Sequence, residues 1–110
     1  SGNLGLDLAT SIDCTLIDFK LQRIPTGIKG PVTAGGQTMG ALLIGRSSAS
    51  MVGLTIIVGL IDANYIGEIQ IMAQTLFPPL FIPAGSQIAQ LILLPQLTRG
   101  TLPLGEQQRG

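Results

Sequence analysis

Short apolar stretches make up most of this chain, and glycine or proline separates one stretch from the next. In residues 15–22, Ile17, Phe19 and Leu21 alternate with polar residues, which predicts a strand with one apolar face. The Pro-Thr-Gly sequence at 25–27 predicts a turn directly after that strand.

The same pattern continues to residue 95, and no window shows a sustained helical period. Fifteen glycines and seven prolines cut the chain into segments too short for ordinary helices. We therefore predict an all-β fold, either a sandwich or a barrel. Further strands are expected at residues 4–10, 39–44, 54–58, 80–82 and 87–95.

The most informative segment spans residues 59–68. Apolar residues precede it, and polar residues then alternate with apolar ones as far as residue 74, so we expect a hairpin. Asp62 follows an apolar run, which predicts that its carboxylate lies at the mouth of a buried strand. Tyr65 is the only tyrosine, and Gly59 and Gly67 would let a ligand approach the backbone closely.

Composition limits the kind of protein. A chain of 110 residues predicts a single domain over residues 1–110. It is 45% hydrophobic and only 11% charged, so we expect apolar surface that a second copy of the chain would cover. The formal net charge is zero and there is no basic patch, which argues against duplex nucleic acid as a partner.

Several classes of function can be excluded. The chain contains no histidine, which rules out histidine triads and histidine zinc sites, and no P-loop motif. Cys14 is the only cysteine, so no internal disulfide forms and a reducing compartment is expected. Apolar runs are far shorter than the ~20 residues that cross a bilayer. No secretory signal is visible, so we expect no membrane partner and an intracellular rather than secreted protein.

Four short motifs carry a resemblance to a known family. GLIDANYIGEI, which begins at Gly59, resembles the third motif of the homotrimeric dUTP pyrophosphatases (dUTPases). Gly5, Asp7 and Leu8 match the first motif, GRSS at 45–48 resembles the second, and QIAQL at 87–91 resembles the fourth. The residues of the second and fourth motifs are most similar to those of retroviral and endogenous retroviral dUTPases. This similarity adds a virion-associated location as an alternative.

The resemblance implies a jelly-roll-like β-barrel subunit that assembles into a homotrimer. It also implies hydrolysis of dUTP to dUMP and pyrophosphate with Mg²⁺, which Asp7 would hold through water. Asp62 would activate the attacking water, and Tyr65 would pack beneath the deoxyribose. Backbone groups around Gly59–Ile61 and Glu68–Met72, with Gly59, Ile61, Glu68 and Ile69 among them, would read the uracil. The triphosphate would be bound by Arg46, Ser47, Ser48 and Gln90.

The match is incomplete at two places. Gln87 stands where the family usually has a basic residue. In the fifth motif an arginine reaches the γ-phosphate and a phenylalanine covers the uracil. Here Arg109-Gly110 resembles the opening of this motif, and Arg99-Gly100 is a weaker candidate because no phenylalanine follows it. We therefore expect the 110 residues to bind dUTP with magnesium but to hydrolyse it poorly.

Two other interpretations stay open. The first is a dUTPase-like trimer, catalytically weak or inactive, that binds nucleotide or a protein partner. The second is a protein similar to dCTP deaminase on the same fold, which Tyr65 in an IDxxY pattern disfavours.

Overall fold

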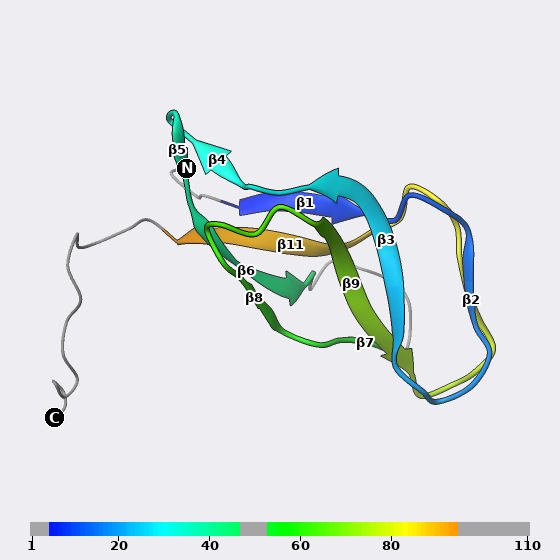
Figure 1. Ribbon diagram of the computed structural model, residues 1–110. Coiled ribbons are helices and arrows are strands. Elements are labelled where there is room, and N and C mark those ends of the chain that lie inside the picture. Colours follow the sequence, from blue (N-terminus) through cyan, green and yellow to red (C-terminus); the bar gives the residue numbers. More distant parts are fainter. Residues whose placement is uncertain (1–4, 47–52, 95–110) are drawn as a thin grey trace, which may run out of the picture.

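The structure, a computed structural model, describes residues 5–46 and 53–94, and strands and loops account for both ranges (Figure 1). The expected all-β class is confirmed. These residues contain no helix long and apolar enough to cross a membrane. The strands are β1 (Gly5–Ala9), β2 (Cys14–Leu16), β3 (Gln22–Lys29), β4 (Thr33–Ala34), β5 (Gln37–Thr38), β6 (Gly40–Gly45), β7 (Leu54–Ile56), β8 (Gly59–Ile61), β9 (Glu68–Thr75), β10 (Leu80–Ile82) and β11 (Gln87–Leu94).

Two antiparallel sheets enclose the core. One has the strand order β1-β11-β6-β8 and the other β3-β9-β7, while β2 pairs with β10 and β4 with β5. In β9, Ile69, Ile71 and Ala73 are buried while the residues between them are not, which confirms the predicted period of two. The largest fully buried apolar side chains are Leu8, Leu16, Ile24, Ile69, Ile71, Ile82 and Ile88.

The strand predicted for residues 15–22 is wrong over most of its length. β2 ends at Leu16, and β3 begins only at Gln22. Between them the carboxylate of Asp18 accepts a hydrogen bond from the backbone N–H of Lys20, at 3.0 Å. This local bond replaces strand pairing and turns the chain, as aspartate side chains commonly do.

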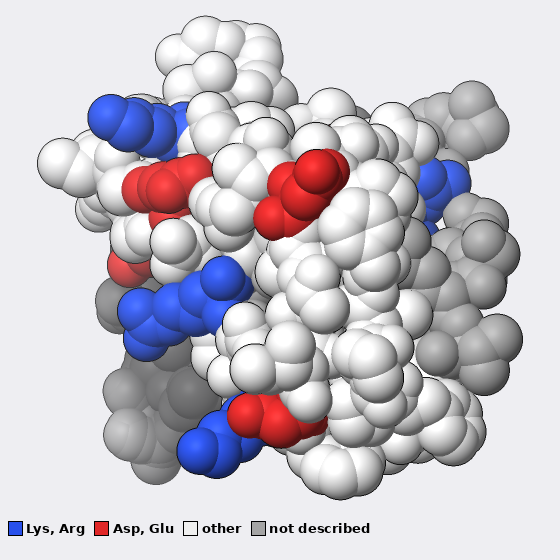
Figure 2. Space-filling view, turned by 90° about the vertical axis from the view of Figure 1, so that its right-hand side faces the viewer, with Lys and Arg blue, Asp and Glu red and all other residues white. Residues whose placement is uncertain are grey.

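The interrupted strand leaves apolar side chains in solvent at the β2 end of the molecule. Ile17, Phe19, Phe77 and Phe81 are all more than half exposed. Figure 2 views the molecule from this end: most charged side chains gather on the left of the view, and a broad area to their right carries few charges. The low charge content of the sequence is therefore visible as an apolar surface, and what covers it stays a prediction.

The Pro-Thr-Gly sequence at 25–27 does not end a strand as predicted; it lies inside β3 as an irregularity. The register of β3 against β9 shifts between Pro25 and Lys29. There the buried hydroxyl of Thr26 donates to the backbone oxygen of Ile69 at 2.6 Å and accepts from the N–H of Ile28. The Thr26 side chain thus takes the place of missing ladder bonds, and it anchors β3 to the start of β9.

Candidate functional site

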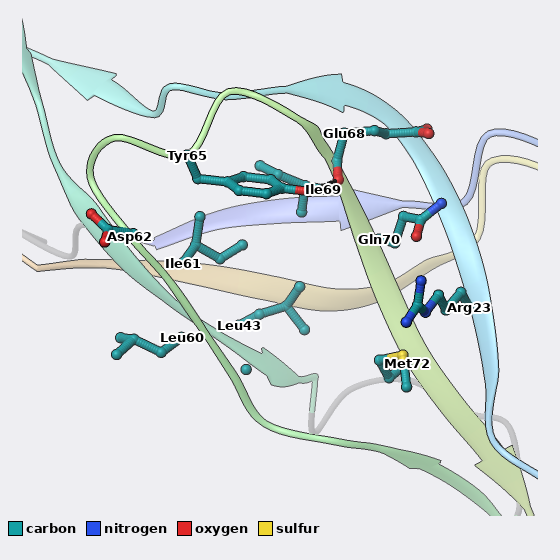
Figure 3. Close-up of a pocket in the computed structure, with 11 residues that line it drawn as sticks. Arg23, Leu43, Leu60, Ile61, Asp62, Tyr65, Glu68, Ile69, Gln70 and Met72 are labelled. Carbon is teal, nitrogen blue, oxygen red and sulfur yellow. Dashed lines mark hydrogen bonds between the residues drawn. The ribbon is translucent and has the colours of Figure 1, made fainter.

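The segment 59–68 contains the expected turn, but its two strands do not pair with each other. β8 joins β6 in one sheet, and β9 pairs with β3 and β7 in the other. Because the strands separate, a cleft of about 460 Å³ opens between them (Figure 3). Its lining consists of Arg23, Leu43, Gly59, Leu60, Ile61, Asp62, Tyr65, Glu68, Ile69, Gln70 and Met72.

Asp62 lies in a tight turn at one end of the cleft. Its backbone oxygen accepts a hydrogen bond from the N–H of Tyr65, and its Oδ1 accepts one from the N–H of Asn64, both at 3.0 Å. The strand before it is not buried as predicted, since Leu60 is 74% exposed. Figure 3 shows the carboxylate on the outer side of the turn, directed away from the ring of Tyr65.

The Tyr65 ring forms a wall of the cleft, held at both ends. Its hydroxyl donates to the backbone oxygen of Glu68 at 2.6 Å. A Cβ on Gly67 would lie 2.8 Å from that hydroxyl, and a Cβ on Gly30 would collide with the Tyr65 carbonyl oxygen. Glycine at these two positions therefore fixes where the ring and its backbone lie.

One edge of β9 faces the cleft without a strand partner. In a strand, successive residues direct their N–H and C=O groups to opposite sides. The oxygen of Ile69 faces β3, where it accepts from Thr26, and the oxygen of Met72 faces β7, where it accepts from Ile57. Gln70 has the same orientation as Met72, but β7 does not extend that far. The backbone N–H and C=O of Gln70 therefore point into the cleft.

Three charged residues line the cleft, and they lie at different ends. Asp62 and Glu68 flank Tyr65, and the carboxylate of Glu68 accepts a hydrogen bond from the N–H of Gly27 at 2.9 Å. Arg23 pairs in register with Met72 and lies at the other end. Asp62, Tyr65 and Glu68 were predicted from the sequence, as were Gly59, Ile61 and Ile69, and the structure brings all six together.

A second group of predicted residues lies on the outer face of the other sheet. Asp7 and Gln90 are register partners on β1 and β11. Their side chains lie on the face away from the core, because Leu8, Ala89 and Leu91 beside them are buried. Arg46 follows β6, with its Nε 3.6 Å from the Asp7 carboxylate and its guanidinium donating to Oε1 of Gln87 at 3.0 Å. We call Asp7, Arg46, Gln87 and Gln90 the arginine cluster.

The cleft and the arginine cluster are far apart within one chain. Asp62 follows Ile61, which pairs with Ala41, whereas Gln90 pairs with Ile44. Asp62 is thus displaced from Gln90 by roughly 13 Å along the strands and about 10 Å across them. Within one copy of the chain, Asp62 and the arginine cluster therefore cannot contact the same phosphate group of a bound nucleotide. Ser47, Ser48 and Arg109 lie outside the described residues.

The described residues gather no three metal-ligating side chains of the histidine, cysteine, aspartate or glutamate type. Asp7 is half exposed, and Arg46 is its charged neighbour. A single accessible carboxylate fits Mg²⁺ when waters and substrate phosphates complete its coordination, which is how this ion usually binds. The site fits a water-mediated magnesium ion and does not fit a permanent protein-bound metal.

Sequence reasoning missed Arg23 and the contact that Gln87 makes. Arg23 lies in the stretch that was misread as strand and turn, so nothing linked it to residues 59–72. Gln70 lies within the range Glu68–Met72, whose backbone groups were expected to read the base. Gln87 was noted as a departure from the family pattern, and the structure shows that its amide oxygen holds Arg46.

Comparisons with known proteins show which sequences and structures the chain is similar to. The family model described as dUTPase matches residues 1–109. The Gag-Pro polyprotein of Sheep pulmonary adenomatosis virus is 43% identical over 111 residues, which cover 99% of this chain and 12% of the polyprotein. That of Mason-Pfizer monkey virus is 43% identical over 95 residues, which cover 86% of this chain and 10% of the polyprotein. The chain thus spans about a tenth of the length of these relatives.

Solved structures show the same fold. The native EIAV dUTPase superimposes with a TM-score of 0.70 at 29% identity, covering 93% of this chain and 83% of that one. A mutant dUTPase from phage phi11 of S. aureus gives a TM-score of 0.73 at 20% identity, with 92% and 82% covered. The family model, the retroviral relatives and this shared fold establish that the chain belongs to the dUTPase family.

Proposed function

We propose that this chain hydrolyses dUTP to dUMP and pyrophosphate as a homotrimer. The observation that carries the proposal is the cleft between β8 and β9, with Asp62 and Tyr65 at one end and an unpaired strand edge along one wall. Family membership supports the same reaction. The division of the predicted residues into two separate groups supports assembly.

The unpaired edge of β9 suits a uracil ring. Gln70 offers one N–H donor and one C=O acceptor side by side, and uracil presents a carbonyl oxygen next to a ring N–H. Leu43 and Ile61 supply apolar walls for the faces of the ring. In a cleft bounded by two backbones, thymine's extra methyl group would have to displace main chain, which is costly.

Tyr65 would lie beneath the deoxyribose. Because its hydroxyl is bound to the Glu68 carbonyl and Gly67 lies directly beneath it, the ring cannot retreat. A ribose carries an additional 2′-hydroxyl on the sugar face that packs against such a ring, so UTP should fit less well than dUTP.

The arginine cluster would bind the triphosphate. The Arg46 guanidinium offers charge-assisted hydrogen bonds to phosphate oxygens, and the half-buried amide of Gln90 adds neutral ones. Asp7 would hold Mg²⁺ through water, and the ion would offset the negative charge of the phosphates when bound. The phi11 phage dUTPase mutant coordinates a structural Mg(II) ion, which supports a role for this metal.

Asp62 would act as the general base. Its Oδ1 is held by the N–H of Asn64, which fixes the carboxylate and leaves the second oxygen to accept a proton from a water molecule. That water would attack the α-phosphorus and release pyrophosphate. The outward direction of the carboxylate means that the phosphate chain would lie outside the cleft, while the base and sugar would lie within it.

The second copy follows from this division. Since the arginine cluster of one chain is too far from its own Asp62, the cluster that meets the phosphates would belong to a neighbouring subunit. The apolar surface and low charge of the chain are compatible with such assembly. A trimer would then contain three sites, each formed between subunits.

Mixed trimers test both the reaction and its shared site. Asp62→Asn and Arg46→Gln chains are each expected to be weakly active, but when refolded together about a quarter of the sites would combine an intact Asp62 with an intact Arg46. Recovery of roughly that fraction of wild-type dUTP hydrolysis supports the proposal. No recovery, with both variants trimeric by light scattering, rules out the shared site. Wild-type protein that binds dUTP but does not hydrolyse it supports the alternative of a nucleotide-binding trimer without catalysis.

A further inference from the structure

Arg23 is an unexplained charge at the end of the cleft remote from Asp62. Its side chain extends from β3 toward β9, beside Gln70 and Met72, and it lines the cleft (Figure 3). Within residues 5–46 and 53–94, its guanidinium takes part in no hydrogen bond or ion pair. The two carboxylates of the lining already accept hydrogen bonds from backbone N–H groups, Asp62 from Asn64 and Glu68 from Gly27.

The cleft has a direction that determines which part of a nucleotide reaches Arg23. Tyr65 and Glu68 mark the sugar end, and Met72 lies four residues further along β9, roughly 13 Å away in an extended strand. A pyrimidine is attached to its sugar through N1, and the ring atom opposite N1 is C4. The substituent on C4 therefore points away from the sugar end and toward Arg23.

The backbone groups of Gln70 alone do not distinguish uracil from cytosine. Uracil presents an oxygen acceptor at C4 and an N–H donor at N3, whereas cytosine presents an amino donor at C4 and an acceptor at N3. One backbone N–H beside one C=O satisfies either arrangement if the ring shifts along the strand. A further group that only donates would accept just one of the two rings.

We propose that Arg23 selects uracil over cytosine by donating to the oxygen on C4. The inference rests on the proposed function, because it assumes that the base enters this cleft with its sugar at Tyr65. A guanidinium carries donors and no acceptor. It therefore binds a carbonyl oxygen, whereas opposite the amino group of cytosine two donors would face each other with no hydrogen bond between them.

Binding titrations of dUTP and dCTP with magnesium test the assignment. The proteins are wild type, Arg23→Gln, Arg23→Lys and, as a matched control, Lys20→Gln, which removes one positive charge from the 17–21 loop outside the cleft. We expect Arg23→Gln to reduce the preference for dUTP over dCTP by about tenfold or more, since the charged hydrogen bond is lost. Arg23→Lys should retain most of the preference, and Lys20→Gln all of it.

The ways in which this inference can fail are distinguishable. Wild type that prefers dUTP, together with an Arg23→Gln variant that prefers it equally, overturns the role of Arg23 and leaves the proposed function intact. Equal weakening of both nucleotides also overturns it, because Arg23 would then contact something common to both. Wild type that binds neither nucleotide overturns the proposed function and this inference together. An unfolding temperature for each variant shows that the binding measurements compare folded proteins.

Discussion

The cleft and the arginine cluster are opposite kinds of surface. The cleft is concave, its shape comes from backbone and glycines, and Gln70 contributes main-chain groups rather than its side chain. The arginine cluster lies on the outer face of a sheet and acts through the side chains of Asp7, Arg46, Gln87 and Gln90. The first suits a neutral, planar ring, and the second suits flexible, highly charged phosphates.

This difference explains why the two regions can belong to different copies of the chain. A ring must be matched in shape to fractions of an ångström, so its binding surface has to come from one rigid unit. Phosphate oxygens accept hydrogen bonds from many directions, so they tolerate an arginine delivered across an interface. The expected consequences of breaking each region therefore differ in kind as well as in size.

The largest effect is expected from Asp62→Asn. The substitution keeps the shape and most of the hydrogen bonding of the turn but removes the proton acceptor. Hydrolysis of dUTP should fall by about 10²-fold or more, while dUTP binding changes little. Single-turnover hydrolysis and a binding titration on the same preparation measure the two quantities. Turnover close to that of wild type would exclude Asp62 as the base.

Gly30→Ala tests whether the cleft depends on the backbone in this way. Its Cβ would collide with the carbonyl oxygen of Tyr65, which cannot move without displacing the turn at 62–65. We expect the free energy of unfolding to fall by roughly 1–3 kcal/mol, as for other overpacked positions. Gly59→Ala is the matched control, because nothing lies within 4 Å of its Cβ position. Equal effects in urea unfolding would contradict the argument.

The smallest effect is expected from Arg46→Gln. This variant should weaken binding of a ligand that carries phosphates and leave binding of a ligand without phosphate unchanged. Binding of dUTP should weaken about tenfold, because one charge-assisted contact to phosphate is lost. Binding of deoxyuridine, which has no phosphate, should stay the same within error. Calorimetry with both ligands measures the difference. A comparable loss for deoxyuridine would place Arg46 in the base-binding region instead.

The buried pattern was predictable from the sequence, because alternation is read directly from residue types. β1, β6, β10 and β11 lie close to their predicted positions, and the all-β class is confirmed. The errors arose where a polar side chain bonds to nearby backbone. Asp18 turns the chain within an apparently regular strand, and Thr26 keeps β3 continuous through a proline and a glycine.

The residues of the cleft were partly predictable, but its form was not. A local pattern around residues 59–68 indicates a turn with strands on both sides, and it does not specify whether these strands pair. Their separation depends on β6 and β7, which pair with β8 and β9. Arg23 reaches the cleft through the register of β3 on β9, which joins two segments that are distant in the sequence.

The unpaired backbone N–H and C=O of Gln70 also determine which substitutions position 70 can tolerate. Every amino acid except proline presents the same backbone N–H and C=O, and the side chain at position 70 is exposed. Replacements there would therefore preserve recognition of the base, and only proline would abolish the donor in one step. Under the proposed function, this position could vary widely without loss of the groups that bind the base.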